Sequence, residues 1–266
     1  MTQPEETAKP AEADTPAGQA PETSGSSAAV QPGADPSPRT LAVSGASGKT
    51  GWRVAQQALQ RGWRVRALFR PGSTLPPALE AAAAGDGPLT VLRLELSDTE
   101  ALHHALQGCD ALVIATGSRP SINLAGPLQV DALGVREQLR ACRAVGLQRV
   151  VLVSSLCAGR WRHPLNLFGL ILVWKRLGER WLEQSGLQWT VIRPGGLSED
   201  DRRSTCEGVV FSGPDQQESA SQPRQLVARV CLEALDTPAA IGRIIEITSS
   251  PQQPQQSLVS WLSAAA

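Results

Sequence analysis

A short apolar run and a helical stretch flank three glycines that are spaced three residues apart. The run is Leu41–Val43, and the helical pattern begins at Gly51, the third glycine after Gly45 and Gly48. In such a strand–loop–helix unit the first glycine permits a tight turn, the second lets the backbone approach a pyrophosphate, and the third lets helix and strand pack closely. Free amides at the helix start, aided by the helix dipole, then bind phosphate. We therefore predict a phosphate-binding loop made of Gly45, Ala46, Ser47, Gly48, Lys49, Thr50 and Gly51.

The rest of the chain continues this alternation of apolar runs and helical stretches. Strands that are apolar throughout, each followed by a helix, indicate a parallel sheet that is covered on both faces. We predict an α/β fold, namely a Rossmann-type doubly wound parallel sheet. Ser97 and Glu100 have capping-box spacing, which predicts that the third helix starts there. The expected strands span 41–43, 64–69, 90–94, 111–115, 149–153, 189–192 and 243–247, and the expected helices span 51–60, 77–84, 98–106, 129–145, 167–182 and 225–235.

The first 38 residues differ in composition from the rest. They contain no Leu, Ile, Phe or Trp and are dense in Pro, Ala, Ser, Glu and Gln. Such a segment buries too little apolar surface to offset its chain entropy. We predict a disordered acidic tail at 1–38 and a single Rossmann domain at 39–266.

The charges of the 266-residue chain balance, with 25 basic and 25 acidic residues, but they are unevenly placed. The tail holds six acids and one lysine, a net charge of −5, so residues 39–266 hold 24 bases and 19 acids, a net charge of +5. This mild excess suits a phosphorylated ligand and is too small for a nucleic-acid-binding surface. We expect no nucleic acid partner.

No segment of the sequence is typical of a membrane span or a metal site. The most apolar window, Leu165–Trp174, has ten residues, whereas a span needs about twenty. The tail lacks the apolar run of a signal peptide, and its acidity is unlike that of an organelle transit peptide. Five cysteines lie far apart without a CxxC pair, which favours reduced, buried thiols. We expect a cytoplasmic protein with no membrane span and no metal ion.

The end of the second expected strand indicates which cofactor is bound. NAD sites usually place Asp or Glu there to accept hydrogen bonds from the ribose hydroxyls, whereas NADP sites place Arg near the 2′-phosphate. This chain has Leu68-Phe69-Arg70 and no acid in the segment. Arg70 is either an ordinary solvent-facing arginine or the phosphate ligand. We predict the second, and hence NADP rather than NAD.

Further motifs strengthen this interpretation. Besides the Gly-x-x-Gly-x-x-Gly loop they include Leu94-Glu95-Leu96-Ser97-Asp98 and Val150-Val151-Leu152-Val153-Ser154-Ser155. They resemble the atypical short-chain dehydrogenase/reductases, in the NAD(P)H-binding, NmrA-like branch. Residues 172–176 and 189–197 are similar to the dehydrogenase-like subunit of the chloroplast protein translocon and its cyanobacterial relatives. The resemblance covers about residues 40–249, in a branch that mixes reductases with proteins that bind cofactor and regulate or assemble others.

The resemblance also implies where each part of the cofactor is bound. It puts residues 46–51 at the pyrophosphate and Glu95 and Leu96 beside the adenine. It puts Ala115, Thr116 and Gly117 near a ribose, and Ser154, Lys175, Pro194, Gly195, Gly196 and Leu197 near the nicotinamide. These positions lie at the carboxyl ends of expected strands, where ligands bind in open α/β sheets.

One departure from the family pattern affects catalysis. The family usually has a Tyr, the proton donor to the carbonyl, four residues before the Lys. Ile171 stands there, and the chain contains no Tyr. Lys175 can still bind ribose, but Ile171 cannot donate a proton, so Lys175 and Ser154 are the only candidate catalytic residues. Ser154 is equally well explained as a hydroxyl that ends a strand.

Two functions are compatible with these residues. The first is an NADP-dependent oxidoreductase that transfers hydride to a small acceptor without the Tyr proton donor. The second is a non-catalytic NADP(H)-binding protein, a redox-responsive scaffold or assembly factor with a protein partner. The missing Tyr favours the second function, while the retained Lys175 and the segment 194–196 exclude neither.

Overall fold

The computed structural model describes residues 39–118 and 125–264, apart from positions 161 and 168. The chain divides into two units, Met1–Asp35 and Pro36–Ala266, and every described residue belongs to the second. The tail at 1–38, which the sequence predicts to be disordered, lies outside the described residues.

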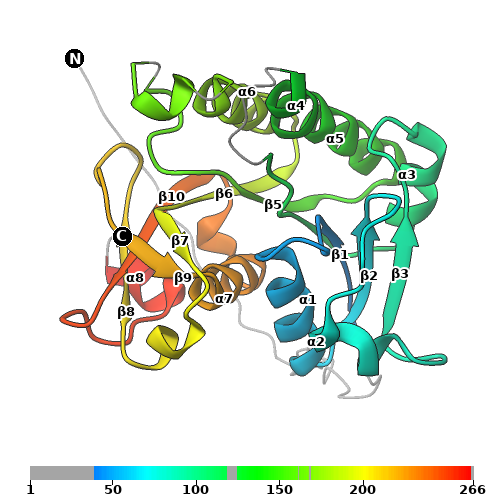
Figure 1. The fold of residues 1–266 in the computed structure, drawn as a ribbon, viewed down its shortest axis with the longest axis horizontal. Coiled ribbons are helices and arrows are strands. Elements are labelled where there is room, and N and C mark those ends of the chain that lie inside the picture. Colours follow the sequence, from blue (N-terminus) through cyan, green and yellow to red (C-terminus); the bar gives the residue numbers. More distant parts are fainter. Residues whose placement is uncertain (1–38, 119–124, 161, 168, 265–266) are drawn as a thin grey trace, which may run out of the picture. The chain divides into compact units, whose positions relative to one another are not determined.

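Eight strands form one sheet in the order β3-β2-β1-β4-β5-β6-β10-β8 (Figure 1). Strand order reverses between β1 and β4, which is the switch point where doubly wound sheets bind their ligands. The predicted Rossmann-type sheet is therefore confirmed. Its strands are β1 Thr40–Ser44, β2 Arg64–Phe69, β3 Leu89–Arg93, β4 Ala111–Ile114, β5 Arg149–Val153, β6 Gln188–Pro194, β8 Gly208–Ser212 and β10 Arg243–Ser250.

The expectation of an entirely parallel sheet is wrong at one edge. All neighbouring strands pair in parallel except β8, which runs antiparallel to β10. After β6 ends at Pro194 the chain makes only β7 (Gly196–Ser198) and a 3₁₀ turn (Asp201–Thr205) before β8 begins. No helix carries the chain back to the opposite end of the sheet, so β8 starts at the edge where β6 ended and must run antiparallel. A small second sheet pairs β7 with β9 (Ser221–Pro223).

Helices cover both faces of the large sheet (Figure 1). The face covered by α1 and α7 has a buried core that includes Val43, Val113 and Ile245, and the opposite face, under α3, α5 and α6, has a core that includes Leu112 and Val150. Leu112 and Val113 belong to different cores because side chains alternate across a strand. The helices are α1 Gly51–Gln60, α2 Pro77–Glu80, α3 Thr99–Leu106, α4 Ala125–Pro127, α5 Gly134–Val145, α6 Ile171–Glu183, α7 Arg224–Leu235 and α8 Leu258–Ala264.

Three predicted helix starts differ from the observed ones. The cap of α3 is Asp98, whose carboxylate accepts a hydrogen bond from the amide of Ala101, and not Ser97. The helix expected from residue 167 begins at Ile171, because Leu170 has a φ of 55° and ends the regular helical geometry. The helix expected from residue 129 opens with a π-helical turn, Leu128–Leu133, before α5.

Two findings concern the expected absence of a membrane span and the state of the thiols. None of the helices in the described part of the chain is both long enough and apolar enough to span a bilayer.

All five cysteines are free, as predicted, and four of them are buried, but Cys206 is exposed. It follows the exposed 3₁₀ turn between β7 and β8.

Candidate functional site

The glycine loop between β1 and α1 packs closely against neighbouring backbone. Gly45 has a φ of 76°, and a Cβ there would meet the backbone of Ala115 and Thr116 at 2.9 Å. A Cβ on Gly51 would lie 2.7 Å from the carbonyl carbon of Gly45 and nearer still to its oxygen. Backbone atoms cannot rotate away as a side chain can, so both positions require glycine. The loop therefore has the tight turn and the close helix–strand approach that the sequence predicts.

The same loop presents backbone amides at the start of a helix. Gly45 and Ala46 donate hydrogen bonds to the carbonyl of Leu68 in β2 at 3.2 and 3.3 Å, which ties the turn to the sheet. The first turn of α1 contains no acidic residue, so no side chain of the helix itself neutralises its positive end. The loop thus suits a phosphate anion. The loop amides with no acceptor among the described residues are those of Ser47, Lys49, Thr50 and Gly51.

Three hydroxyls lie at the carboxyl ends of adjacent strands. Ser44 ends β1, Thr116 follows β4 and Ser154 follows β5. Each hydroxyl oxygen is buried and has no hydrogen-bond partner among the described residues. Leaving a buried polar group unpaired costs about 1–3 kcal/mol, so such groups usually have a partner. Their position at the switch point suits a polar ligand laid along this edge.

Lys175 of α6 lies beside the predicted ribose-binding segment. Its Nζ donates to the Oδ1 of Asp131 at 2.8 Å, with the two side chains only 13% and 2% exposed. Asp131 also accepts a hydrogen bond from the backbone amide of Ser118 at 3.1 Å. A Cβ on Gly117 would contact both the lysine nitrogen at 3.7 Å and the carboxylate at 3.8 Å. Lys175 is therefore held in one orientation next to Gly117.

Ile171, at the position of the family's Tyr, is part of an apolar cluster. Its side chain is buried with those of Leu156, Cys157 and Leu172. The cluster offers an apolar wall one helical turn from Lys175 and contains no proton donor stronger than a thiol. Burial raises the pKa of that Cys157 thiol, which keeps it protonated and makes it a poor acid.

The segment from Pro194 to Leu197 is tied to its surroundings by backbone hydrogen bonds. Leu156 donates to the carbonyl of Pro194, Gly195 donates to that of Ile247, and Gly196 donates to that of Ala220. These bonds bring the loop after β5 and the end of β6 together, as expected for neighbouring strands. Leu197 lies next in the chain and is a partly exposed apolar residue.

The residues predicted to bind the adenosine half lie at the ends of β2 and β3. Arg70 follows β2 directly and is exposed. Glu95 is exposed as well, whereas Leu96 is half-buried and contacts the start of α5, where a Cβ on Gly134 would lie 2.8 Å from its Cδ1. Leu96 therefore has a packing role of its own, and Arg70 and Glu95 are accessible to a ligand.

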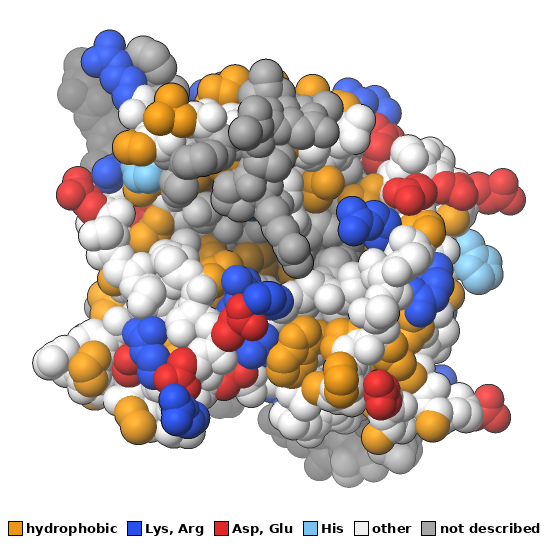
Figure 2. All heavy atoms as spheres, viewed as in Figure 1, with side chains coloured by type: hydrophobic (Ala, Val, Ile, Leu, Met, Phe, Trp, Pro, Cys, Tyr) orange, Lys and Arg blue, Asp and Glu red, His pale blue; other side chains and the backbone are white. Residues whose placement is uncertain are grey.

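Basic side chains of the loop and of α1 are paired with acids from a distant segment. Lys49 bonds to Glu199, and Arg53 bonds to Asp201 through its Nε at 2.8 Å and its Nη2 at 2.6 Å. The hydrogen bond from Lys49 lowers the pKa of Glu199. Figure 2 shows basic and acidic side chains gathered over the start of α1 and the segment after β7. Two ion pairs thus connect the segment 199–201 to the N-terminal end of α1, which is predicted to bind phosphate.

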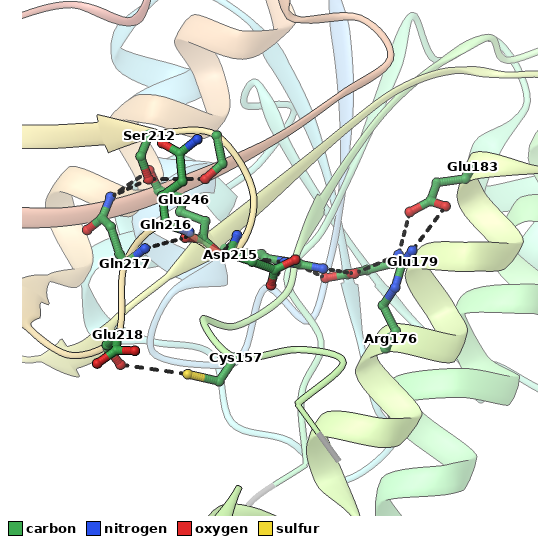
Figure 3. Close-up of polar contacts among 12 residues, drawn as sticks. Cys157, Arg176, Glu179, Glu183, Ser212, Asp215, Gln216, Gln217, Glu218 and Glu246 are labelled. Carbon is green, nitrogen blue, oxygen red and sulfur yellow. Dashed lines mark hydrogen bonds and ion pairs between the residues drawn. The ribbon is translucent and has the colours of Figure 1, made fainter. Parts of the chain in front are cut away.

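A buried network of ion pairs joins α6 to β6. Arg193 is 2% exposed and binds Glu179 of α6 through two hydrogen bonds of 2.9 and 2.8 Å. It also pairs with Asp215 at 3.1 Å and with Glu246 of β10 at 3.5 Å. Figure 3 shows Glu179, Asp215 and Glu246 in this network, in which Glu246 also accepts the amides of 215–217. The network joins the helix that carries Lys175 to the strand that ends at Pro194.

Sequence patterns alone did not identify several of these residues. Asp131 interrupts an apolar stretch between Val130 and Ala132, a local sign that it has a buried partner, but nothing local connects it to Lys175. Glu199 and Asp201 lie in an acidic segment that resembles any exposed loop. Their partners become evident only when the segment after β7 is placed beside the start of α1.

Comparison with known proteins then identifies the chain. A family model described as NAD(P)H-binding matches residues 45–238, from the first glycine of the loop to beyond α7. The chain belongs to the NAD(P)H-binding family. The matched region contains every predicted cofactor residue of this family member. Its match confirms the family resemblance that the motifs indicate.

Relatives of this NAD(P)H-binding chain have several descriptions. A chloroplastic protein of Arabidopsis thaliana is 33% identical over 226 residues, which cover 81% of this chain and 78% of that protein. Sanguinarine reductase of Eschscholzia californica is 27% identical, over 80% of this chain and 90% of the reductase. Protein TIC 62 of Pisum sativum is 26% identical, over 82% of this chain but only 45% of its own length. A solved Bacillus halodurans structure described as an NAD-dependent epimerase/dehydratase has 25% identity and a TM-score of 0.72, and covers 85% of this chain and 99% of that one.

The residues of the site fit the cofactor that the family implies. The glycine loop with its unpaired amides suits the pyrophosphate, and the unpaired hydroxyls with Lys175 suit the ribose and nicotinamide half. In the described ranges no group of three or more His, Cys, Asp or Glu side chains could hold a metal ion. The chain is thus an NAD(P)-binding protein with an oxidoreductase-like fold.

Proposed function

We propose that this chain is an NADP(H)-dependent oxidoreductase that reduces a small, electron-poor acceptor. The observation that carries the proposal is the largely buried Lys175, held by Asp131 beside Gly117 at the carboxyl edge of the sheet. A buried amine costs free energy unless it is paired, and this pair orients the lysine toward the ribose-binding segment. When bound, the cofactor supplies the hydride, and the protein supplies orientation and a dry pocket.

The apolar surroundings of Ile171 limit the acceptors that can be reduced. Leu156, Cys157 and Leu172 surround the position from which a Tyr would protonate an alkoxide. A ketone needs that proton as negative charge develops on its oxygen, whereas a quinone or a flavin delocalises the charge itself. The reductase among the relatives supports a reductive role for this site. Placement in the NmrA-like branch and a cytoplasmic location stay predictions.

Arg70 is expected to decide between the two nicotinamide cofactors. The native protein should bind NADPH more tightly than NADH, because an exposed guanidinium at the end of β2 can make charge-assisted hydrogen bonds to the 2′-phosphate. Arg70→Ala should reduce this preference by about 1.5–3 kcal/mol and leave NADH affinity nearly unchanged. Isothermal titration of both cofactors measures the difference.

Arg64→Ala is the matched control for this experiment, since Arg64 is an exposed arginine at the opposite end of the same strand. It should leave both affinities as they are. Equal affinity of the native protein for NADPH and NADH would contradict the NADP assignment.

The choice of acceptor provides the test of the catalytic proposal. Quinones or flavins should be reduced by NADPH, while simple ketones should react at least about 100-fold more slowly, since general-acid help is typically worth 10²–10⁴-fold. The measurement is NADPH oxidation against a panel of both kinds of acceptor. Rapid ketone reduction that depends on Lys175 would show that the site has a proton donor we have not identified.

The second candidate is a non-catalytic NADP(H)-binding scaffold or assembly factor with a protein partner. The described apolar cluster around Ile171 favours this candidate, because it contains no proton donor stronger than the Cys157 thiol. It is distinguished by the same panel: cofactor binding with no turnover of any acceptor would favour the scaffold. Lys175→Ala should weaken cofactor binding under both proposals, so this variant alone does not separate them.

A further inference from the structure

Arg224, the first residue of α7, extends to the glycine loop. Its Nη1 donates to the Oγ1 of Thr50 at 2.9 Å, although the two residues are 174 positions apart in the chain. Thr50 is 7% exposed and immediately precedes α1, where its amide has no acceptor among the described residues. The guanidinium of Arg224 therefore lies against the phosphate-binding end of the helix.

Charge balance distinguishes Arg224 from the other cations at this end of α1. Lys49 and Arg53 are each paired with a carboxylate, of Glu199 and Asp201 respectively. Arg224 has no carboxylate within ion-pair distance in the part of the chain that the structure describes. Three cations and two carboxylates leave a net charge of +1 in this cluster, and Arg224 is the cation without an ion-pair partner.

The hydrogen-bonding capacity of Arg224 is also only partly used. Its Nε is buried without an acceptor, and its Nη2 makes no hydrogen bond to a described residue. Burial lowers the pKa of the guanidinium, although not enough to remove its charge at neutral pH. A half-buried cation with unused donors is stabilised by an anionic acceptor, and none of the described residues provides one.

We propose that Arg224 is a further cofactor-binding residue that contacts the pyrophosphate. This inference rests on the proposed NADP(H) binding. The pyrophosphate is common to NADH and NADPH, whereas the 2′-phosphate belongs to NADPH alone. Arg224 therefore contributes to the affinity for both cofactors, and Arg70 sets the preference between them.

The test compares two substitutions that separate charge from shape. Arg224→Gln keeps a donor for Thr50 but removes the charge, and Arg224→Lys keeps the charge. The affinities of the full chain for NADPH, NADH and ADP-ribose are measured at two salt concentrations. We expect the Gln variant to bind all three ligands roughly 10- to 100-fold more weakly, and by the same factor for NADPH and NADH. The Lys variant should lose much less, and the native salt dependence should exceed that of the Gln variant.

Arg229→Gln is the matched control on the same helix, because Arg229 pairs with Glu233 and Gln255 instead. It should bind all three ligands as the native chain does. Thermal midpoints without cofactor verify that each variant folds. If the Arg224→Gln variant does not fold, the affinities of the Arg224→Lys variant and the salt dependence of native binding test the proposal.

Native affinity in the Gln variant would overturn the proposal. A loss confined to NADPH would also overturn it, since Arg224 would then bind the 2′-phosphate. Equal losses of affinity in the Gln and Lys variants would also overturn it, since Arg224 would then only stabilise the loop. If the native chain binds neither cofactor, the proposed function itself is wrong. If the native chain binds both cofactors and the Arg224 variants bind them equally well, only the role of Arg224 is wrong.

Discussion

Gly51→Ala is expected to abolish measurable cofactor binding, weakening the affinity for NADPH by at least about 100-fold. The added Cβ would lie 2.7 Å from the carbonyl carbon and 2.9 Å from the Cα of the residues that form the turn, Gly45 and Ala46. The loop must move to accept it, and two or more charge-assisted hydrogen bonds to phosphate, each worth about 1.5–3 kcal/mol, would be lost. The displaced loop should also lower the thermal midpoint of the protein.

Two other glycines provide a graded comparison. A Cβ on Gly48 would lie 3.1 Å from the carbonyl oxygen of Gly45, a contact that a small shift relieves, so Gly48→Ala should have an intermediate effect. A Cβ on Gly126 in α4 meets no described atom within 4 Å, and Gly126→Ala should leave binding and stability unchanged. Titration of NADPH and thermal unfolding of the three variants measure this order. A Gly51→Ala protein that binds NADPH normally would contradict the assignment of the loop.

Arg193→Met is expected to destabilise the protein by about 3–5 kcal/mol, because breaking a buried ion pair leaves its partners uncompensated. Glu179 and Glu246 are fully buried, and both bind this guanidinium. For a domain of this size the change corresponds to a fall of roughly 6–20 °C in thermal midpoint. Because the network joins α6 to β6, activity per folded molecule should also fall as Lys175 and Pro194 lose their common support.

A double variant distinguishes lost charge pairing from lost packing. Arg193→Met combined with Glu179→Leu removes both members of the strongest pair and should recover part of the lost stability. Glu246 loses the guanidinium in this variant but keeps hydrogen bonds from three backbone amides. Arg202→Ala is the surface control: its side chain is 92% exposed and pairs with Asp200, so the change should stay within about 0.5 kcal/mol. Thermal and chemical unfolding give all three values. A loss below about 1 kcal/mol for Arg193→Met would mean that the network is not important for stability.

The predictable parts of the site depend on residues that lie close together in the sequence. Gly45 needs a positive φ and Gly51 needs the space that a Cβ would fill, and both needs come from a turn between a strand and the helix that follows it. The apolar runs predicted seven strands because strands buried on both faces consist mostly of apolar residues. Three strands were not predicted: Gly196–Ser198, Gly208–Ser212 and Ser221–Pro223. The first and the last have only three residues each and therefore no periodicity to detect.

The helix starts show where local patterns mislead. Ser97 and Asp98 both suit a helix cap, and the backbone geometry selected Asp98, whose carboxylate reaches the amide of Ala101. The apolar pattern runs from residue 167 into α6, but the helix begins only at Ile171. Leu167 is consequently 84% exposed in a 3₁₀ turn rather than buried in a helix.

Three features follow from the sequence alone, namely the α/β fold class, the glycine loop between β1 and α1, and the absence of Tyr at the position of Ile171. Each of these is a property of residue types within a few positions of one another, where sterics and periodicity act directly. Two contacts are evident only in the three-dimensional structure: Lys175 pairs with Asp131, 44 residues away, and Arg224 lies against Thr50. Such pairs form because sheet order places distant elements side by side, and burial then makes an unpaired charge too costly to leave alone.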